Sequence, residues 1–282
     1  MEAEEKEYRA LSEEQFDVVK KEYYSATGRC CIKTQTALIL TLKYHLSENE
    51  DLVKRQLKKL FEDSNRKLKT GFVGTPLLCN VLTDYGMEDL AYDLLLNEEY
   101  PGWLHEVKLG ATTVWERWNS LLDDGTISGI SMNSMNHYSY GSVLEWMFRH
   151  AAGLNTIDAV PGMRKIAVAP LLNWKLRKID ASYDSPAGMY RSGWELPDPK
   201  HVTVMDRHPE KLAALREQFG ITTQEKPGDW ITALDVVVLA VKPQGLKECC
   251  EQVASLVSPE TTVLSIAAAV RADVIADWLG TR

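Results

Sequence analysis

Three patterns of hydrophobic and polar positions follow one another along the chain. Up to about residue 155, apolar residues recur at the three- and four-residue spacing of helices. Between residues 156 and 196 the segments shorten to strands and turns. From residue 197 onward, runs of Val and Leu alternate with helical segments, as in a parallel sheet covered on both faces. We therefore expect a multidomain protein with parts at 1–155, 156–196 and 197–282.

The first part is typical of an array of helical hairpins. Residues 36–46 are apolar on nearly every side, which indicates a buried inner helix, whereas 51–67 is charge-rich, as outer helices are. Thr75 and Pro76 suit the N-cap and first position of a helix that Gly86 ends. Further helices are expected over 11–24 (with Ser12 as N-cap), 88–96 and 142–150.

The second part is small. Strands are expected over 165–170 and 178–183, and a third over 188–196 after a turn at 185–188. Three strands are too few for a stable domain, so they must pack on the helices.

The third part begins after the sequence Leu196-Pro-Asp-Pro199 and has the order of a nucleotide-binding fold. Strands are predicted over 202–205, 235–241 and 262–266, and helices over 209–219, 246–256 and 272–279. A dinucleotide fold needs a first strand and a Gly-rich turn that places pyrophosphate on a helix N-terminus. Neither precedes His201, so the sequence predicts a truncated Rossmann-like domain.

Composition excludes several classes of function. The net charge of −8 argues against nucleic-acid binding, and no apolar run approaches the roughly 20 residues of a membrane helix. The N-terminus lacks the features of a signal peptide, so we expect a cytoplasmic location. The five cysteines (Cys30, Cys31, Cys79, Cys249 and Cys250) show no zinc spacing, which predicts reduced thiols and no metal site.

Candidate chemistry concentrates in residues 110–118 and 134–141. These segments combine Glu116 and His137 with several aromatic residues, and sugar-cleaving sites use carboxylates to move protons and aromatic faces to stack on the ring. Taken alone, Glu116 could instead be a helix carboxylate paired with Arg117 or Arg149, and His137 a core histidine. The aromatic residues are as consistent with packing as with ligand contact: Trp118, Tyr138 and Tyr140.

Residues 34–194 resemble the C-terminal part of the α-L-rhamnosidases of glycoside hydrolase family 78. The matching stretches are 34–37, 70–76, 90–96 with 100–101, 110–118 and 134–141, and 161–186 is similar to the start of that family's C-terminal β-sandwich. The resemblance implies part of an (α/α)6 barrel followed by a β-sandwich remnant. It also implies inverting hydrolysis of a rhamnose-containing glycoside.

The same resemblance implies roles for three residues: Glu116 as the general base, and Trp115 and His137 as sugar-binding residues. An inverting enzyme also needs a carboxylic acid roughly 6.5–9.5 Å from the base. The family's acid lies upstream in a segment that nothing here matches, and the N-terminal run Glu4, Glu5 and Glu7 is interpreted as solvated surface. We therefore expect little hydrolysis by this chain alone.

An open barrel edge has a second consequence. It would expose inner helices such as 36–46, which predicts self-association or a complementing chain.

Residues 201–280 resemble the N-terminal domain of pyrroline-5-carboxylate reductase, on the sequences at 206–207, 209–212, 219–220, 235–244, 264–269 and 278–280. The resemblance implies NADP as cofactor, with Arg207 on the 2′-phosphate. Asp206 beside it favours NAD instead, and Arg207 could equally be a surface residue at a helix start. The residues implied at the nicotinamide are Val241, Lys242 and Pro243. Without the Gly-rich turn, NADP binding is expected to be weak.

Three functional hypotheses follow: a rhamnosidase-type hydrolase fragment without its acid, a reductase-type NADP-dependent oxidoreductase, and a non-catalytic fusion product of the two.

Overall fold

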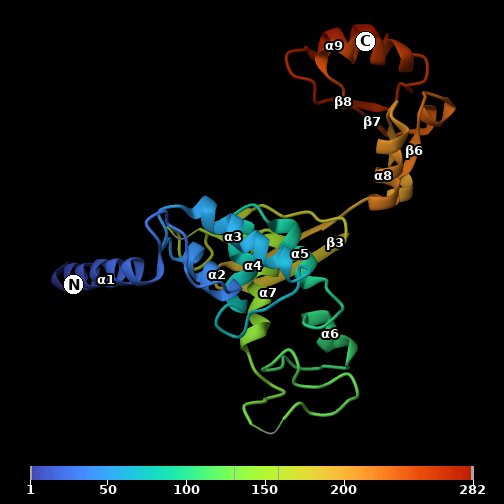
Figure 1. Ribbon diagram of the computed structural model, residues 1–282. Coiled ribbons are helices and arrows are strands. Elements are labelled where there is room, and N and C mark those ends of the chain that lie inside the picture. Colours follow the sequence, from blue (N-terminus) through green and yellow to red (C-terminus); the bar gives the residue numbers. More distant parts are fainter. Residues whose placement is uncertain (1, 130, 158, 281–282) are drawn as a thin grey trace. The chain divides into compact units, whose positions relative to one another are not determined.

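The computed structural model describes residues 2–129, 131–157 and 159–280. The chain divides into two compact units, residues 1–196 and residues 197–282 (Figure 1).

Helices make up most of the first unit. They are α1 (Glu2–Tyr23), α2 (Gln35–Lys43), α3 (Glu50–Asp63), α4 (Thr75–Asp84), α5 (Glu88–Leu95) and α6 (Trp103–Lys108). A long irregular segment follows, and then the 3-10 turn η1 (Ser139–Ser142), α7 (Val143–Trp146) and the π-helical turn η2 (Met147–Ala151). The helices expected over 36–46, 51–67, 75–86, 88–96 and 142–150 are thus present, with ends shifted by a few residues. The six-residue α6 was not predicted.

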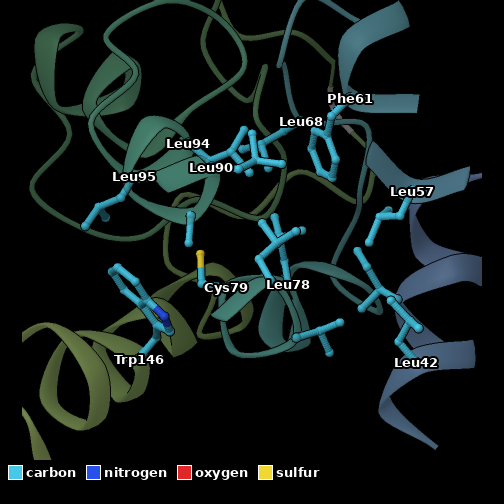
Figure 2. Packing of buried hydrophobic residues seen from close by; sticks show 14 of the residues in the cluster. Leu42, Leu57, Phe61, Leu68, Leu78, Cys79, Leu90, Leu94, Leu95 and Trp146 are labelled. Carbon is cyan, nitrogen blue, oxygen red and sulfur yellow. The ribbon is translucent and has the colours of Figure 1, made fainter. Parts of the chain in front are cut away.

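Helices α2 to α5 enclose the core of this unit. Thr34 starts α2 by accepting a hydrogen bond from the Ala37 amide at 3.2 Å, and Asn49 starts α3 by accepting one from Leu52 at 3.1 Å. Figure 2 shows leucine, phenylalanine and cysteine side chains of these helices converging with Trp146. The residues that are at most 1% exposed include Leu38, Ile39, Leu42, Val53, Leu57, Phe61, Leu78, Leu82, Leu94 and Trp146.

The expectation that the apolar helix over 36–46 would be exposed is wrong. Leu38, Ile39 and Leu42 of α2 are buried because α3 and α4 both pack against that helix. Exposed apolar side chains of this unit include Tyr8, Leu11 and Val18 of α1 and Phe72 of a loop.

Two predicted helix starts also need correction. α1 begins at Glu2, so Ser12 lies inside the helix and is not its N-cap. Carboxylates such as that of Glu5 stabilise the first turns of a helix. Glu5 also pairs with Arg9 one turn later, at 3.0 Å. α4 has Gly74 as its N-cap, which makes Thr75 the first helical residue. A Cβ at Gly74 would lie 2.6 Å from Oγ1 of Thr36, so the close approach to α2 requires glycine there.

Four short strands complete the first unit: β1 (Leu154–Thr156), β2 (Ile166–Val168), β3 (Lys178–Ser185) and β4 (Gly188–Glu195). β1 pairs with β2, and β3 with β4 in a hairpin that turns at 185–188 as predicted. The strands pack on the helices, since the Trp194 indole donates to the Ala151 carbonyl at 2.7 Å and the Ser192 hydroxyl to the Ala152 carbonyl at 2.6 Å. This dependence on the helices was predicted, whereas β1 was not.

The second unit alternates strands and helices. A 3-10 turn η3 (Pro199–His201) leads into β5 (Thr203–Met205), α8 (Pro209–Phe219), β6 (Thr222–Gln224) and the 3-10 turn η4 (Asp229–Ala233). Then come β7 (Val236–Leu239), α9 (Pro243–Val253), β8 (Thr262–Ser265) and α10 (Ala272–Leu279). The predicted strands and helices are present, α8 and α10 with the expected bounds, and β6 is additional.

The strands of the second unit form two separate pairs. β5 lies parallel to β6 and β7 parallel to β8, and no strand of the described residues joins one pair to the other. In a doubly wound sheet of order 3-2-1-4-5, the first strand lies between the second and the fourth. If β5, β6, β7 and β8 correspond to strands 2 to 5, the missing first strand accounts for the division.

The expected coverage of the sheet on both faces is therefore wrong for β7 and β8. One face packs on α9 and α10, in a cluster that contains Leu239, Leu246, Cys250, Val253, Ile275 and Leu279. On the other face, Val236 is 48% and Val238 53% exposed. The Val-rich run predicts a buried strand, but nothing among the described residues covers its second face.

Candidate functional site

The two segments that carry the candidate chemistry lie side by side. The Glu116 amide donates to the Ser134 carbonyl at 2.9 Å, and the His137 amide donates to the Val114 carbonyl at 2.7 Å. The Thr113 hydroxyl also donates to the Met135 carbonyl. Residues 113–116 and 134–137 are thus joined at three points, so a carboxylate and an imidazole about twenty residues apart in the sequence share one region of the fold.

Glu116 is half-buried and held by backbone. Its Oε2 accepts a hydrogen bond from the Ser134 amide at 2.7 Å. The alternative partners are occupied elsewhere, because Arg117 donates to the Ser131 carbonyl at 2.5 Å and Arg149 pairs with Glu145 at 2.9 Å. Within the described ranges Glu116 forms no ion pair, which removes the interpretation of a simple surface salt bridge.

His137 is also half-buried, and its ring orientation is fixed. The Nδ1 atom accepts a hydrogen bond from the Ser139 amide at 3.3 Å, so the neutral ring carries its proton on Nε2. The ring stacks on Tyr138 at a centroid distance of 5.1 Å, and Tyr138 is 85% exposed. A partly exposed imidazole with a defined N–H is suited to a ligand hydroxyl, and the alternative of a core histidine is not supported.

Two of the aromatic residues are packing residues. Trp118 and Tyr140 stack at 3.9 Å with an interplanar angle of 8°, and both are buried. Trp103 meets Trp118 edge-on at 5.2 Å and donates to the Tyr140 carbonyl at 2.9 Å. Trp115 is only 3% exposed, so its ring offers little surface to a sugar, and its sugar-binding role stays a prediction.

Glu106, on α6, is a residue that the sequence analysis missed. Its side chain is 4% exposed, and burial raises its pKa from 4.5 to about 8, although a hydrogen bond from the Trp115 amide opposes the shift. Its Oε1 atom is buried and has no hydrogen-bond partner among the residues that the structure describes. Perturbed carboxyls of this kind cluster at functional sites. Nothing in the sequence signals the burial, because a six-residue helix is too short to show a reliable apolar face.

The cofactor residues implied for the second unit fall into two groups. Arg207 is exposed and follows β5, whereas Val241, Lys242 and Pro243 follow β7, in the other strand pair. Asp206 turns toward the start of α8, where Oδ1 accepts hydrogen bonds from the His208 amide at 2.9 Å and the His208 ring at 2.6 Å. The hydrogen bonds from His208 lower the Asp206 pKa. Asp206 is thus engaged with its own helix.

The second unit does not fit a dinucleotide. The chain enters β5 from the 3-10 turn at Pro199–His201, and the preceding strand β4 is paired with β3 in the first unit. The strand–turn–helix that would hold pyrophosphate is therefore absent from the described part of the chain. Likewise, no three His, Cys, Asp or Glu side chains among the described residues are grouped to hold a metal ion.

The fold defines the class: a helical domain with short antiparallel strand pairs, followed by a segment in which strands and helices alternate as in nucleotide-binding folds. Residues 1–151, more than half of the chain, match the bacterial alpha-L-rhamnosidase six-hairpin glycosidase domain, and the chain belongs to that family. Residues 153–214 match the bacterial alpha-L-rhamnosidase C-terminal domain, and residues 187–269 match the family described as NADP oxidoreductase, coenzyme F420-dependent.

Comparison with individual relatives also assigns the first and second parts of the chain to two different kinds of protein. An alpha-L-rhamnosidase of Formosa agariphila is 41% identical over 165 residues, which are 58% of this chain and 18% of that protein. A pyrroline-5-carboxylate reductase of Pseudomonas aeruginosa is 34% identical over 79 residues, 28% of this chain and 29% of that protein. The chain thus spans under a third of either relative.

Solved structures match the first unit in fold. The Streptomyces avermitilis alpha-L-rhamnosidase, crystallised with L-rhamnose, is 34% identical with a TM-score of 0.63 over 67% of this chain and 18% of its own. An alpha-L-rhamnosidase of Aspergillus terreus is 32% identical with a TM-score of 0.64 over 68% of this chain and 22% of its own. The resemblance to both rhamnosidases and reductases predicted from the sequence is confirmed.

Two further observations concern the cysteine residues and the absence of membrane-spanning helices from the described residues. All five cysteines are free thiols, as predicted. Among the described residues, no helix combines the length and apolar character needed to cross a membrane.

Proposed function

We propose that the first unit is the C-terminal part of an α-L-rhamnosidase-type site, in which Glu116 activates water as general base and His137 binds the sugar. The observation that carries this proposal is the set of hydrogen bonds that join residues 113–116 to residues 134–137. The helices would be the later hairpins of an (α/α)6 barrel, and the ligand class is a rhamnose-containing glycoside, as the names of the matched relatives suggest.

The proposed site contains a general base, Glu116, but no residue of the chain matches the general acid of the family. General acid catalysis typically contributes about 10²–10⁴-fold, so a glycoside with a poor leaving group should be cut very slowly. The proposal is therefore a hydrolase fragment that binds rhamnosides and turns over only activated ones, or that needs a complementing chain to supply the acid.

An assay with two leaving groups tests this proposal. Release of dinitrophenol from an activated α-L-rhamnoside should be measurable, whereas release from a methyl α-L-rhamnoside should not. Glu116→Gln should abolish the former, while Glu62→Gln, which changes an exposed carboxylate of α3, should leave it unchanged. Equal rates for wild type and Glu116→Gln would refute the role of Glu116.

For the second unit, we propose that NADP binds weakly or not at all. The support is the entry into β5 through η3 and the separation of the strand that precedes Arg207 from the strand that precedes Lys242. A reductase-type activity would require saturable enhancement of NADPH fluorescence that Arg207→Ala abolishes. We expect no saturable fluorescence signal. That result would support the hypothesis that the second unit is a non-catalytic part of a fusion product.

A further inference from the structure

A half-exposed phenylalanine lies next to His137. The ring centroids of Phe72 and His137 are 6.4 Å apart, and the two ring planes are tilted by 52°. Phe72 is 52% exposed, whereas phenylalanine is among the residue types that folded proteins most often bury completely. The site described above gives this ring no role, although it is the apolar neighbour of the imidazole that is proposed to bind the sugar.

The turn that carries Phe72 is fixed to the rest of the site. The Thr75 amide donates to the Gly71 carbonyl at 2.9 Å, which closes the turn. The Thr70 and Thr75 hydroxyls share a buried hydrogen bond of 2.8 Å, and the Trp118 indole donates to the Thr70 carbonyl at 2.9 Å. Trp118 lies in the motif segment 110–118, so the backbone on either side of Phe72 is held against that segment.

A ligand can contact both rings at once. Tyr138 stacks on the imidazole of His137 at 5.1 Å with 16° between the planes, which covers one face of that ring. The Nδ1 atom accepts from the Ser139 amide, so the Nε2–H at the ring edge is the donor left for a ligand hydroxyl. A hydrogen bond spans about 2.9 Å. An apolar contact spans about 3.5–4.0 Å. One sugar can therefore make the first to His137 and the second to Phe72.

We propose that Phe72 is a specificity-determining residue of the rhamnoside site, whose ring packs against the methyl group on C5 of a 6-deoxyhexose while His137 binds a neighbouring hydroxyl. This inference rests on the function proposed above. Rhamnose carries a methyl group where an ordinary hexose carries a hydroxymethyl group. Against the Phe72 ring a hydroxyl would lose hydrogen bonds to water, whereas a methyl group loses none and removes apolar surface from water.

Three sugars that differ only in the substituent on C5 test the proposal. L-Rhamnose carries a methyl group there, L-mannose a hydroxymethyl group and L-lyxose a hydrogen atom. NMR titration of the whole chain measures the dissociation constant of each free sugar. The wild type should bind L-rhamnose about tenfold more tightly than L-lyxose, the lower end of what one carbon in an apolar pocket contributes. L-Mannose should bind no more tightly than L-lyxose, and the methyl proton signal of L-rhamnose should move upfield on binding because of the ring current of Phe72.

Two substitutions separate the apolar contact from the aromatic ring. Phe72→Ala should bind L-rhamnose and L-lyxose with affinities within about twofold of each other, because the apolar surface for the methyl group is gone. Phe72→Leu should keep part of the preference for L-rhamnose, since leucine is apolar, but should lose the upfield shift of the methyl signal. Tyr8→Ala is the matched control: it removes an exposed aromatic ring of α1 and should keep both the preference and the shift.

The outcomes separate this proposal from the function on which it rests. Equal affinities of the wild type for L-rhamnose and L-lyxose would overturn the role of Phe72, and so would a wild-type preference in Phe72→Ala. If the wild type binds none of the three sugars, the proposed function is overturned together with this inference. Should Phe72→Ala fail to fold, Phe72→Leu decides, because a methyl shift of wild-type size in that variant would rule out contact with the Phe72 ring.

Discussion

At the scale of single residues, two carboxylates ten positions apart have different environments. Glu116 is half-buried and accepts one backbone hydrogen bond, whereas Glu106 is almost fully buried. The resemblance of residues 110–118 to a known motif was enough to select Glu116. It could not select Glu106, because burial of a single carboxyl depends on how α6 and the motif segment pack, and no sequence pattern records that.

The raised pKa of Glu106 predicts a specific dependence of stability on pH. Because the folded-state pKa is raised from 4.5 to about 8, the stabilising contribution is complete below pH 4.5 and is lost as the pH rises to 8. The free energy of unfolding should fall by up to about 1.4 kcal/mol per pH unit in this window. Glu106→Gln should remove this slope, as measured by urea unfolding at pH 5, 6.5 and 8.

The matched control for this prediction is Glu62→Gln, whose carboxylate is exposed. It should keep the wild-type slope. An identical slope in wild type and Glu106→Gln would show that Glu106 is not the titrating group.

At the scale of elements, the sequence predicted the type of nearly every helix and strand but not what covers them. Residues 36–46 are apolar on nearly every side, and α3 and α4 bury Leu38, Ile39 and Leu42 of that helix instead of leaving them open. Residues 235–241 carry the same continuous apolar signal, yet β7 is covered on one face only. A run of apolar residues indicates that a segment is suited to burial under neighbouring helices or strands. It does not show whether the chain contains those neighbouring elements.

The one-sided burial of β7 predicts that substitutions at two adjacent residues change the free energy of unfolding by very different amounts. Leu239→Ala should cost about 2–5 kcal/mol, because Leu239 is 3% exposed and packs against α9. Val238→Ala should change stability by less than about 0.5 kcal/mol, because Val238 is 53% exposed. Chemical unfolding of both variants measures the difference, and equal costs would mean that β7 is buried on both faces.

At the scale of the whole molecule, the described part of the chain contains two clusters of buried hydrophobic residues, which are its two hydrophobic cores. One lies among α2 to α5 and α7, and the other between β7, β8, α9 and α10. Such an arrangement predicts two unfolding transitions in calorimetry. Leu78→Ala should lower one midpoint and Leu246→Ala the other, since both side chains are fully buried but in different clusters.

In a unit of about 200 residues each kcal/mol lost lowers the midpoint by roughly 2–4 °C, and in one of 60–100 residues by roughly 4–8 °C. The Leu246→Ala shift per kcal/mol should therefore be the larger of the two. A single transition displaced by both substitutions would contradict the presence of independent cores.

The missing neighbour of β5 and β7 has a consequence inside a cell. Among the described residues, β7 pairs with β8 along one edge only, and two of its valines face water; a strand with an unpaired edge and exposed valines is what chaperones and proteases recognise in unfinished chains. The abundance of this protein would then depend on how quickly that region is degraded, and its half-life, more than its catalytic constants, would decide how much of the sugar-binding unit is ever available.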